Sequence, residues 1–330
     1  MPKLSEIVGQ RRAVEQLRRG MTSGKLAHAF LFTGPSGVGK ATTARALAQA
    51  LNCELAPAEG CDSCEACRKL VAGLHPDLIW IAPDGQYIKI EQVRAIEPLL
   101  AYPPHEGKVR LIVLDGADQL NANAANALLK AVEEPKPRTV FVLVASAGHR
   151  VVPTLVSRCQ RVRFAPLALE EVAQVLGQAS ERPEGERRTV AALAEGSPGR
   201  ALRLLGSDQL AAAQRAVDAL LGAASGSAVE SLFESAAEAG KERPVALEAL
   251  DLLRVWLRDV VLVAEGLHEG RLVHADRREE LERMAEGRSR DALLGALRAV
   301  QAAQAALVAN VNPTMTLETM VLRLRQGVWV

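Results

Sequence analysis

Aromatic side chains are scarce in this sequence, since Phe, Tyr and Trp make up 3% of its 330 residues. The chain therefore has little material for the stacking platforms on which single-strand nucleic-acid binding proteins hold bases. Long apolar runs are also missing, because charged residues or prolines interrupt each of them before the roughly 18 residues that a membrane span needs. No apolar segment of a secretory signal follows Met1, so we expect a cytoplasmic protein.

An excess of one charge sign is absent as well, since 40 Lys and Arg stand against 39 Asp and Glu. This balance argues against a coat of positive charge like that of a histone, although it does not exclude a local basic surface. The two halves differ, however. Residues 1–165 carry 21 Lys and Arg against 15 Asp and Glu, a net charge of +6, and residues 166–330 carry −5. We therefore expect the two parts to meet different partners.

Strand-like and helix-like segments alternate over the first half of the chain, the pattern of a parallel sheet covered by helices. Five strands are expected, at His28–Thr33, Leu78–Ala82, Val109–Leu114, Thr139–Ala145 and Arg161–Phe164. The helices expected between them are Arg11–Met21, Lys40–Leu51, Ile90–Leu100 and Asn121–Glu134.

After Pro166 the strand signals end and an Ala/Leu-rich helical pattern follows. Helix-breaking residues at Gly196–Gly199 and Gly206–Asp208 divide this part. The sequence thus predicts an α/β domain over residues 1–165, a small helical unit over 166–208 and a larger helical domain over 209–330.

A glycine-rich segment follows the first expected strand and opens a helix: Gly34, Pro35, Ser36, Gly37, Val38, Gly39 and Lys40. Glycines permit the tight turn, the helix N-terminus favours anions, and the lysine can reach terminal phosphates. The alternative is a plain glycine turn. Ala41 stands where such loops carry the Ser or Thr that ligates magnesium, and Thr42 and Thr43 come too late to replace it without a shift. We expect phosphate binding with impaired handling of Mg²⁺.

Asp115 ends the expected strand Val109–Leu114, the place of an acidic residue that holds magnesium in ATP-hydrolysing proteins. Gly116 follows it, where a carboxylate that activates water would be needed. Asp118 comes next, and it can equally cap the turn before the following helix. Asp115 can also be an ordinary turn residue. Ala41 and Gly116 together indicate a nucleotide site without its hydrolytic groups.

Four of the five cysteines lie in one short stretch, at Cys53, Cys61, Cys64 and Cys67. Four thiolates at this spacing are typical of a closed, tetrahedral structural zinc site in a cytosolic protein. Unliganded thiols and a redox pair are the alternatives. The expected zinc would stabilise a module, residues 53–67, whose own core is too small to fold.

Ser157-Arg158-Cys159 precedes the last expected strand. An arginine at this end of a sheet can reach a nucleotide on a neighbouring subunit and offset charge on the transferred phosphate. The alternative is a surface arginine paired with a carboxylate.

The order of these motifs resembles that of bacterial clamp-loader subunits of the AAA+ class. The residues that carry the resemblance are Ile7–Gln10, His28–Phe32, the glycine-rich loop, the four cysteines, Leu128–Pro135 and Ser157–Cys159. It covers residues 1 to about 205 by specific motifs and the C-terminal third only by length and helical character. Members of the hydrolysing gamma/tau type carry Thr after the loop lysine and Asp-Glu after the strand, so this chain looks more like the non-hydrolysing type.

The resemblance implies an AAA+ parallel-sheet P-loop domain, a small helical lid and a helical collar that forms oligomers. It implies that Val8 borders the adenine pocket of an ATP/Mg²⁺ site, that the loop from Gly34 to Lys40 cradles the phosphates, and that Ser146 reads the γ-phosphate. The second sensor arginine, Arg200, is displaced by one position, with Gly199 in its usual place. The four cysteines would hold zinc, and Arg158 would act in trans on ATP of the adjacent subunit.

The implied partners are the gamma/tau and delta subunits of a clamp loader, and through the complex the sliding clamp and primer–template DNA. Two alternatives remain open: a hydrolysing ATPase of the gamma/tau kind, and a zinc-dependent DNA-binding module. Against the second stand Glu54, Glu59, Asp62 and Glu65, which surround Arg68 and Lys69 in the cysteine segment.

Overall fold

The computed structural model describes residues 2–85, 87–206, 208–225, 228–267 and 272–328. They group into two compact units, a sheet unit, Met1–Glu171, and a helical unit, Val172–Val330. The predicted division of the second half near residue 208 stays a prediction. Ser207, part of the expected break there, lies outside the described residues.

Five parallel strands form the sheet, in the order β2-β3-β4-β1-β5. Their bounds are β1 Ala29–Thr33, β2 Leu78–Ile81, β3 Arg110–Asp115, β4 Thr139–Ala145 and β5 Gln160–Arg163. Each predicted strand is confirmed, with its ends shifted by at most one residue. The central strands β3, β4 and β1 are almost wholly buried, as their continuous apolar runs require.

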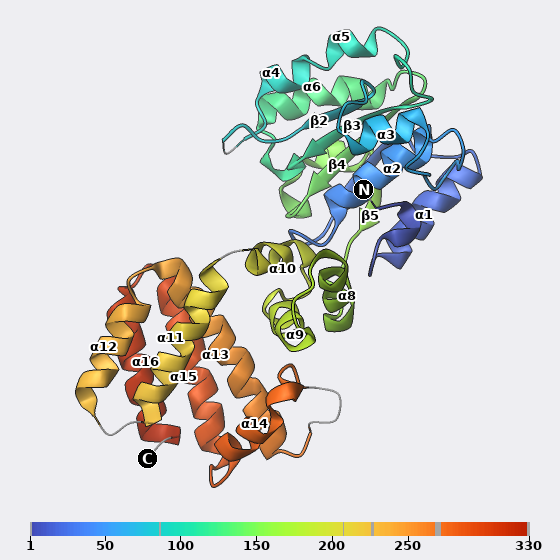
Figure 1. Cartoon of the computed structure of the whole chain (residues 1–330). Coiled ribbons are helices and arrows are strands. Elements are labelled where there is room, and N and C mark those ends of the chain that lie inside the picture. Colours follow the sequence, from blue (N-terminus) through green and yellow to red (C-terminus); the bar gives the residue numbers. More distant parts are fainter. Residues whose placement is uncertain (1, 86, 207, 226–227, 268–271, 329–330) are drawn as a thin grey trace. The chain divides into compact units, whose positions relative to one another are not determined.

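Helices cover both faces of the sheet, with α1, α2 and α3 on one side and α4, α5 and α6 on the other (Figure 1). Their bounds are α1 Arg11–Thr22, α2 Lys40–Asn52, α3 Glu65–Val71, α4 Ile90–Arg94, α5 Glu97–Leu100, α6 Ala122–Glu133 and α7 Pro153–Val156. The single helix predicted over Ile90–Leu100 is wrong. It is divided into α4 and α5 because Pro98 has no N–H and its ring clashes with the carbonyl of Arg94 in a continuous helix.

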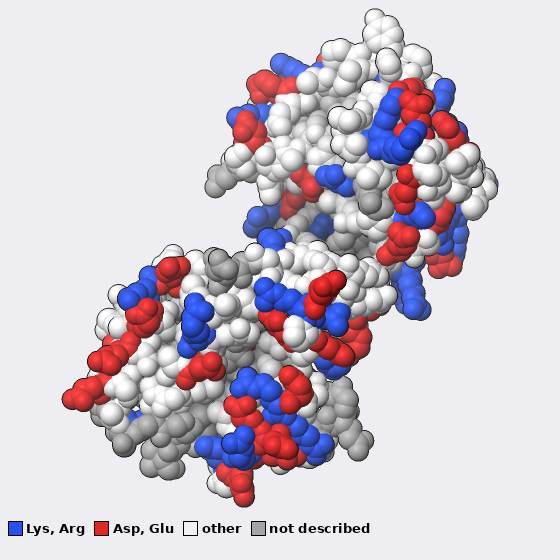
Figure 2. All heavy atoms as spheres, viewed as in Figure 1, with Lys and Arg blue, Asp and Glu red and all other residues white. Residues whose placement is uncertain are grey.

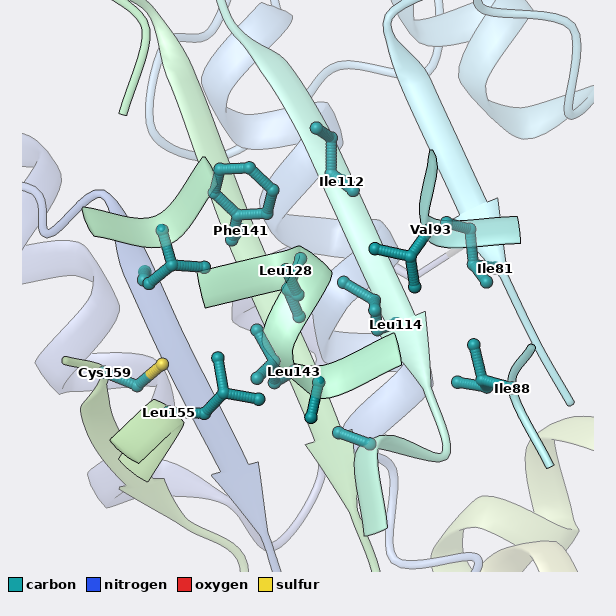
Figure 3. Close-up of a cluster of buried hydrophobic side chains, with 14 of the residues drawn as sticks. Ile81, Ile88, Val93, Ile112, Leu114, Leu128, Phe141, Leu143, Leu155 and Cys159 are labelled. Carbon is teal, nitrogen blue, oxygen red and sulfur yellow. The ribbon is translucent and has the colours of Figure 1, made fainter. Parts of the chain in front are cut away.

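A large hydrophobic core lies between the sheet and helices α4, α6 and α7 (Figure 3). Alternate residues of β3 and β4 point into it, because successive strand side chains face opposite sides of a sheet. Members drawn in the figure include Ile112, Leu114, Leu128, Phe141, Leu143, Leu155 and Cys159. The core therefore joins α6 and α7 to the middle of the sheet.

The described residues of the helical unit contain helices and no strand. α8, Leu169–Ala179, begins just before this unit. The others are α9 Glu184–Leu193, α10 Pro198–Leu205, α11 Asp208–Ser225, α12 Val229–Ala239, α13 Arg243–Ala264, α14 Arg278–Ala285, α15 Arg290–Val308 and α16 Pro313–Val328. α13 packs against α11 and α15, and α15 against α16. No helix in the described ranges has the length and apolar composition needed to cross a membrane.

Charges of both signs are interspersed on the face shown in Figure 2. Ion pairs account for part of this pattern, such as Arg277 with Glu280 and Arg278 with Glu282 in α14 and the turn before it. The opposite net charges of the two halves therefore do not form a patch of one sign on this face.

Candidate functional site

The glycine-rich loop joins β1 to α2, as the sequence predicts for a phosphate-binding loop. Gly34, Gly37 and Gly39 all have positive φ, at 151°, 74° and 100°. A Cβ at Gly34 would lie 2.2 Å from the carbonyl oxygen of Phe164, so only glycine fits there. The loop leads directly into the N-terminus of α2, where unpaired backbone N–H groups favour an anion.

Lys40, the first residue of α2, is turned back onto this loop. Its Nζ donates to the carbonyl oxygens of Gly34 and Pro35, both at 2.6 Å. Burial lowers the pKa of Lys40, and the nearby carboxylates of Asp118 and Asp115 act in the opposite direction. The ammonium thus lies inside the phosphate-binding loop, bonded to backbone oxygens.

The segment around Val8 is fixed to the same loop through Gln10. The buried Gln10 side chain donates to the carbonyls of Val38, at 3.1 Å, and Ala165, at 2.7 Å. It also accepts from the N–H of Ala165 at 3.2 Å. Half-buried Val8 therefore lies two residues from a side chain that ties the loop to the segment after β5.

The sheet order places the ends of β3, β4 and β1 side by side at one edge. Asp115 ends β3, Ser146 follows β4 and Gly34 follows β1. Thr33 pairs with Ala145 in register, so Gly34 and Ser146 hold equivalent next positions. Three predicted nucleotide-site elements thus meet at the carboxyl edge of a parallel sheet, where such sheets bind ligands.

The acidic groups of this edge differ in their surroundings. Burial raises the pKa of Asp115, opposed by Lys40 and Arg45. Asp118 accepts from the backbone N–H of Ala147 at 2.8 Å, and Asn121 caps α6 instead. The alternative that Asp118 caps the turn before this helix is not borne out, because its carboxylate bonds to Ala147. Its carboxylate fixes the segment that carries Ser146.

The hydroxyl of Thr43 does not replace the one missing at Ala41. The Oγ1 of Thr43 is buried and donates to the carbonyl of Gly39 at 2.8 Å, within its own helix. Ser and Thr side chains in helices commonly make this bond to the preceding turn. Thr43 is therefore engaged away from the position at which the loop would need a magnesium ligand.

The four clustered cysteines converge in space. Their Sγ atoms all lie within 4.8 Å of one another, and Cys53, Cys64 and Cys67 are buried. Four sulfurs at about 2.3 Å from a central ion form a tetrahedron with edges of about 3.8 Å, so the cluster fits a metal of this kind. These thiols can bind a metal ion.

Backbone N–H groups already point at these sulfurs. Cys53 accepts from Ala56, Cys61 from Cys64, and Cys64 from Cys67, at 3.2 to 3.4 Å. The hydroxyl of Ser63 and the N–H of Cys64 lower the pKa of Cys61 to about 6, whereas burial raises that of Cys67 to about 12. Burial therefore disfavours the thiolate of Cys67 when no cation is bound. With one, the N–H groups stabilise the thiolates.

Arg158 lies between α7 and β5, as predicted, and its side chain is 38% exposed. Its Nη2 lies 2.6 Å from Oε1 of Glu133, the last residue of α6. Cys159, the fifth cysteine, is buried, and burial raises its pKa to about 11. Arg158 thus pairs with a carboxylate of the same chain, which is the alternative considered for this arginine.

Arg200 lies in the first turn of α10, in the helical unit, and pairs with Asp251 of α13 at 2.7 Å. Ser197 caps α10 by accepting from the N–H of Arg200. This arginine is therefore bound by a carboxylate of its own unit.

Comparison with known proteins decides the family. The family "DNA polymerase III, delta subunit" matches residues 9–168, and "DNA polymerase III, delta subunit, C terminal" matches residues 217–326. The chain is 31% identical over 321 residues to DNA polymerase III subunit delta′ of Bacillus subtilis, which covers 96% of this chain and 97% of that protein. The chain belongs to the DNA polymerase III subunit delta′ family.

This delta′-family chain is also similar to DNA polymerase III subunit tau of Escherichia coli, at 34% identity over 255 residues. That match spans 74% of this chain and 39% of tau. Among solved structures it is similar to a DNA polymerase III gamma subunit-related protein of Thermotoga maritima, with 19% identity, a TM-score of 0.40, and coverage of 95% and 98% of the two chains. By its sequence relatives the chain belongs to the clamp-loader family of DNA polymerase III. The sheet order confirms the predicted parallel-sheet domain, and the described residues after it form helices, as predicted.

The contacts of two residues at these sites were not predicted, although both residues lie in the motifs that carry the resemblance. Gln10 joins the glycine-rich loop to residue 165, and Glu133 meets the guanidinium of Arg158. Both contacts join residues 25 or more positions apart on different elements. Neither residue lies in a local spacing pattern that would have indicated its partner.

Proposed function

We propose that this protein is a delta-prime-type subunit of the DNA polymerase III clamp loader. In this role it assembles with gamma/tau and delta subunits into a hetero-pentamer that opens the sliding clamp and places it on primer–template DNA. The observation that carries the proposal is the match to subunit delta′ over nearly the whole length of both chains. Residues 1–165 serve as the AAA+ domain, 166–208 as its lid, and 209–330 as the collar that meets other subunits.

The nucleotide site of the chain itself contributes little hydrolysis in this proposal. Its support is the chemistry at the carboxyl edge of the sheet. The loop keeps its glycines and Lys40, but Ala41 offers no hydroxyl and Thr43 is engaged by Gly39. Gly116 follows Asp115, at the position where a carboxylate that activates water would be needed, so this position has no acidic side chain. ATP can then be held by Val8, the loop, Asp115 and Ser146 without efficient turnover.

Arg158 acts in trans as the arginine finger of the adjoining gamma/tau site. It is part of the Ser157-Arg158-Cys159 motif, is partly exposed, and lies at the edge strand β5. A guanidinium presents planar donors that match phosphate oxygens and offsets the charge that develops during phosphoryl transfer.

The cysteine cluster holds a structural zinc ion. Four sulfurs leave no open position for a reacting ligand, so the zinc stabilises the module rather than taking part in catalysis.

The assembly is tested by purifying the chain together with differently tagged gamma/tau and delta subunits and weighing the product by native mass spectrometry. A complex that contains this chain is expected. A chain that stays alone while the other subunits assemble would overturn the proposal.

A second candidate is a hydrolysing ATPase of the gamma/tau kind, which the similarity to tau favours. The isolated chain separates the two. Magnesium-dependent ATP turnover well above background would support the ATPase, and turnover near background supports the delta-prime type.

The zinc-dependent DNA-binding module is less well supported. Glu59 pairs with Arg18, and Lys69 pairs with Glu65 and Glu106, so several charges of the segment are engaged within the chain. Strong, salt-sensitive DNA binding by the isolated chain would favour this alternative.

Lys40→Ala is expected to weaken ATP binding by the isolated chain while changing the DNA-stimulated turnover of the reconstituted complex less than about twofold, because this site contributes little hydrolysis. Isothermal titration with ATP and a steady-state ATPase assay measure the two effects. A large loss of turnover in the complex would show that this site hydrolyses ATP.

A further inference from the structure

The guanidinium of Arg158 is held by acceptors from two elements. Nη2 meets Oε1 of Glu133 at 2.6 Å, and Nη1 donates to the carbonyl of Thr154 at 2.9 Å and to Oγ of Ser157 at 3.3 Å. Ser157 in turn donates to the carbonyl of Thr154 at 3.0 Å. The side chain is therefore oriented although it is partly exposed.

Arg158 and Glu133 are both flanked in the chain by side chains of the same hydrophobic core. Leu155 and Cys159, on either side of Arg158, point into the cluster in Figure 3 and are 0% and 9% exposed. Leu128 and Val132 anchor α6 in that cluster, and Glu133 is the next residue. Packed cores resist displacement, so the distance between the two backbones is fixed and the carboxylate has a defined place relative to the finger.

The dipole of α6 does not stabilise the carboxylate of Glu133. The C-terminus of a helix carries partial negative charge, so an acidic residue in the last turn is unfavourable there. The carboxylate of the adjacent Glu134 has no partner in the described part of the chain. Only the first of the two glutamates meets a cation, which points to a role directed at Arg158 rather than at α6.

The contacts leave donors on the guanidinium. Arginine has five N–H groups, and the three contacts within the described residues use at most three of them. The remaining two can meet phosphate oxygens while Glu133 keeps its bond. The carboxylate of Glu133 thus orients the guanidinium of Arg158 without using all of its N–H donors.

We propose that Glu133 is the positioning residue of the arginine finger and holds Arg158 oriented for the nucleotide of the neighbouring subunit. An arginine side chain has much rotamer freedom, and orienting it before the reaction removes that cost from the step itself. Charge-assisted bonds to carboxylates are the strong ones among side-chain hydrogen bonds. The inference rests on the proposed function, because it requires Arg158 to act in trans.

Glu133→Gln in the reconstituted complex tests this. Gln keeps the size of Glu but removes its charge. We expect DNA-stimulated kcat at the adjoining site to fall about two- to fivefold, the order expected for loss of one partly exposed ion pair, with KM for ATP unchanged. Glu134→Gln is the matched control, since it removes the same charge one residue away, and it is expected to leave kcat unchanged.

The double variant separates positioning from a general structural role. In an Arg158→Ala background, Glu133→Gln is expected to cause no further loss of kcat. The thermal unfolding of the Glu133→Gln protein should match that of the Glu134→Gln control. Two outcomes would overturn this inference while leaving the proposed finger intact. One is an equal loss of kcat from Glu133→Gln in the presence and in the absence of Arg158. The other is a rise in kcat, which would mean that Glu133 restrains the finger. Unchanged turnover in Arg158→Ala overturns the proposed finger and the inference with it.

Discussion

Replacing Arg158 by alanine is expected to slow ATP hydrolysis at the adjoining gamma/tau site on the order of 100-fold or more, because arginine fingers contribute roughly 10³–10⁵-fold to kcat. The protein itself should fold normally, since the guanidinium is partly exposed and only its contacts with Glu133, Thr154 and Ser157 are lost. The measurement is DNA-stimulated turnover of the reconstituted complex, together with a single-turnover burst that resolves the affected site.

Arg161→Ala is the matched control for this experiment. Arg161 is an exposed arginine of β5, three residues further on, and its side chain has no partner among the described residues. The Arg161→Ala variant removes the same charge from the edge strand that follows Arg158. Unchanged turnover in Arg158→Ala, or equal losses in both variants, would contradict a specific role for Arg158.

Disrupting the proposed zinc site is the second change with a large expected effect. Cys67→Ala takes away a fully buried cysteine of the cluster, and the segment from Cys53 to α3 is expected to unfold while the sheet remains. Structural zinc binds small modules with about 10–16 kcal/mol of apparent free energy, far more than a segment of this size gains from its own packing. The purified protein should contain about one zinc per chain, as a closed four-sulfur site requires.

Zinc content by plasma emission and protease sensitivity of residues 53–71 measure this effect. Cys159→Ala is the control, because Cys159 is also buried but lies in the core beside α7 and outside the cluster. It should leave the zinc content unchanged. Much less than one zinc per chain in the unaltered protein, or equal losses in both variants, would refute a zinc site at the cluster.

Much of the site follows from local pattern. The glycine loop was predictable because positive φ angles need glycine, and the structure has them at Gly34, Gly37 and Gly39. The four cysteines converge as their spacing predicts, because each turn between them is short. Pro98 also carried a local signal, since proline interrupts a helix, and it divides the helix that was predicted over Ile90–Leu100.

Contacts between elements far apart in the sequence could not be predicted from local patterns. One expected role for Asp118 was to cap the turn before the next helix, but its carboxylate accepts from Ala147, because the sheet brings the end of β4 beside the end of β3. Arg200 was expected one position away from the usual place of a sensor arginine, and its partner, Asp251 of α13, was not predicted.

The sequence by itself determined the strands, the loop, the cysteine cluster and the absence of a hydroxyl at Ala41, because each depends on residues close together in the chain. Only the tertiary structure decided the partner of each charged group: Lys40 with the loop carbonyls, and Arg158 with Glu133. The physical reason is that a charge takes the nearest compatible partner in space. Packing of the sheet and its helices sets that proximity, and sequence spacing does not.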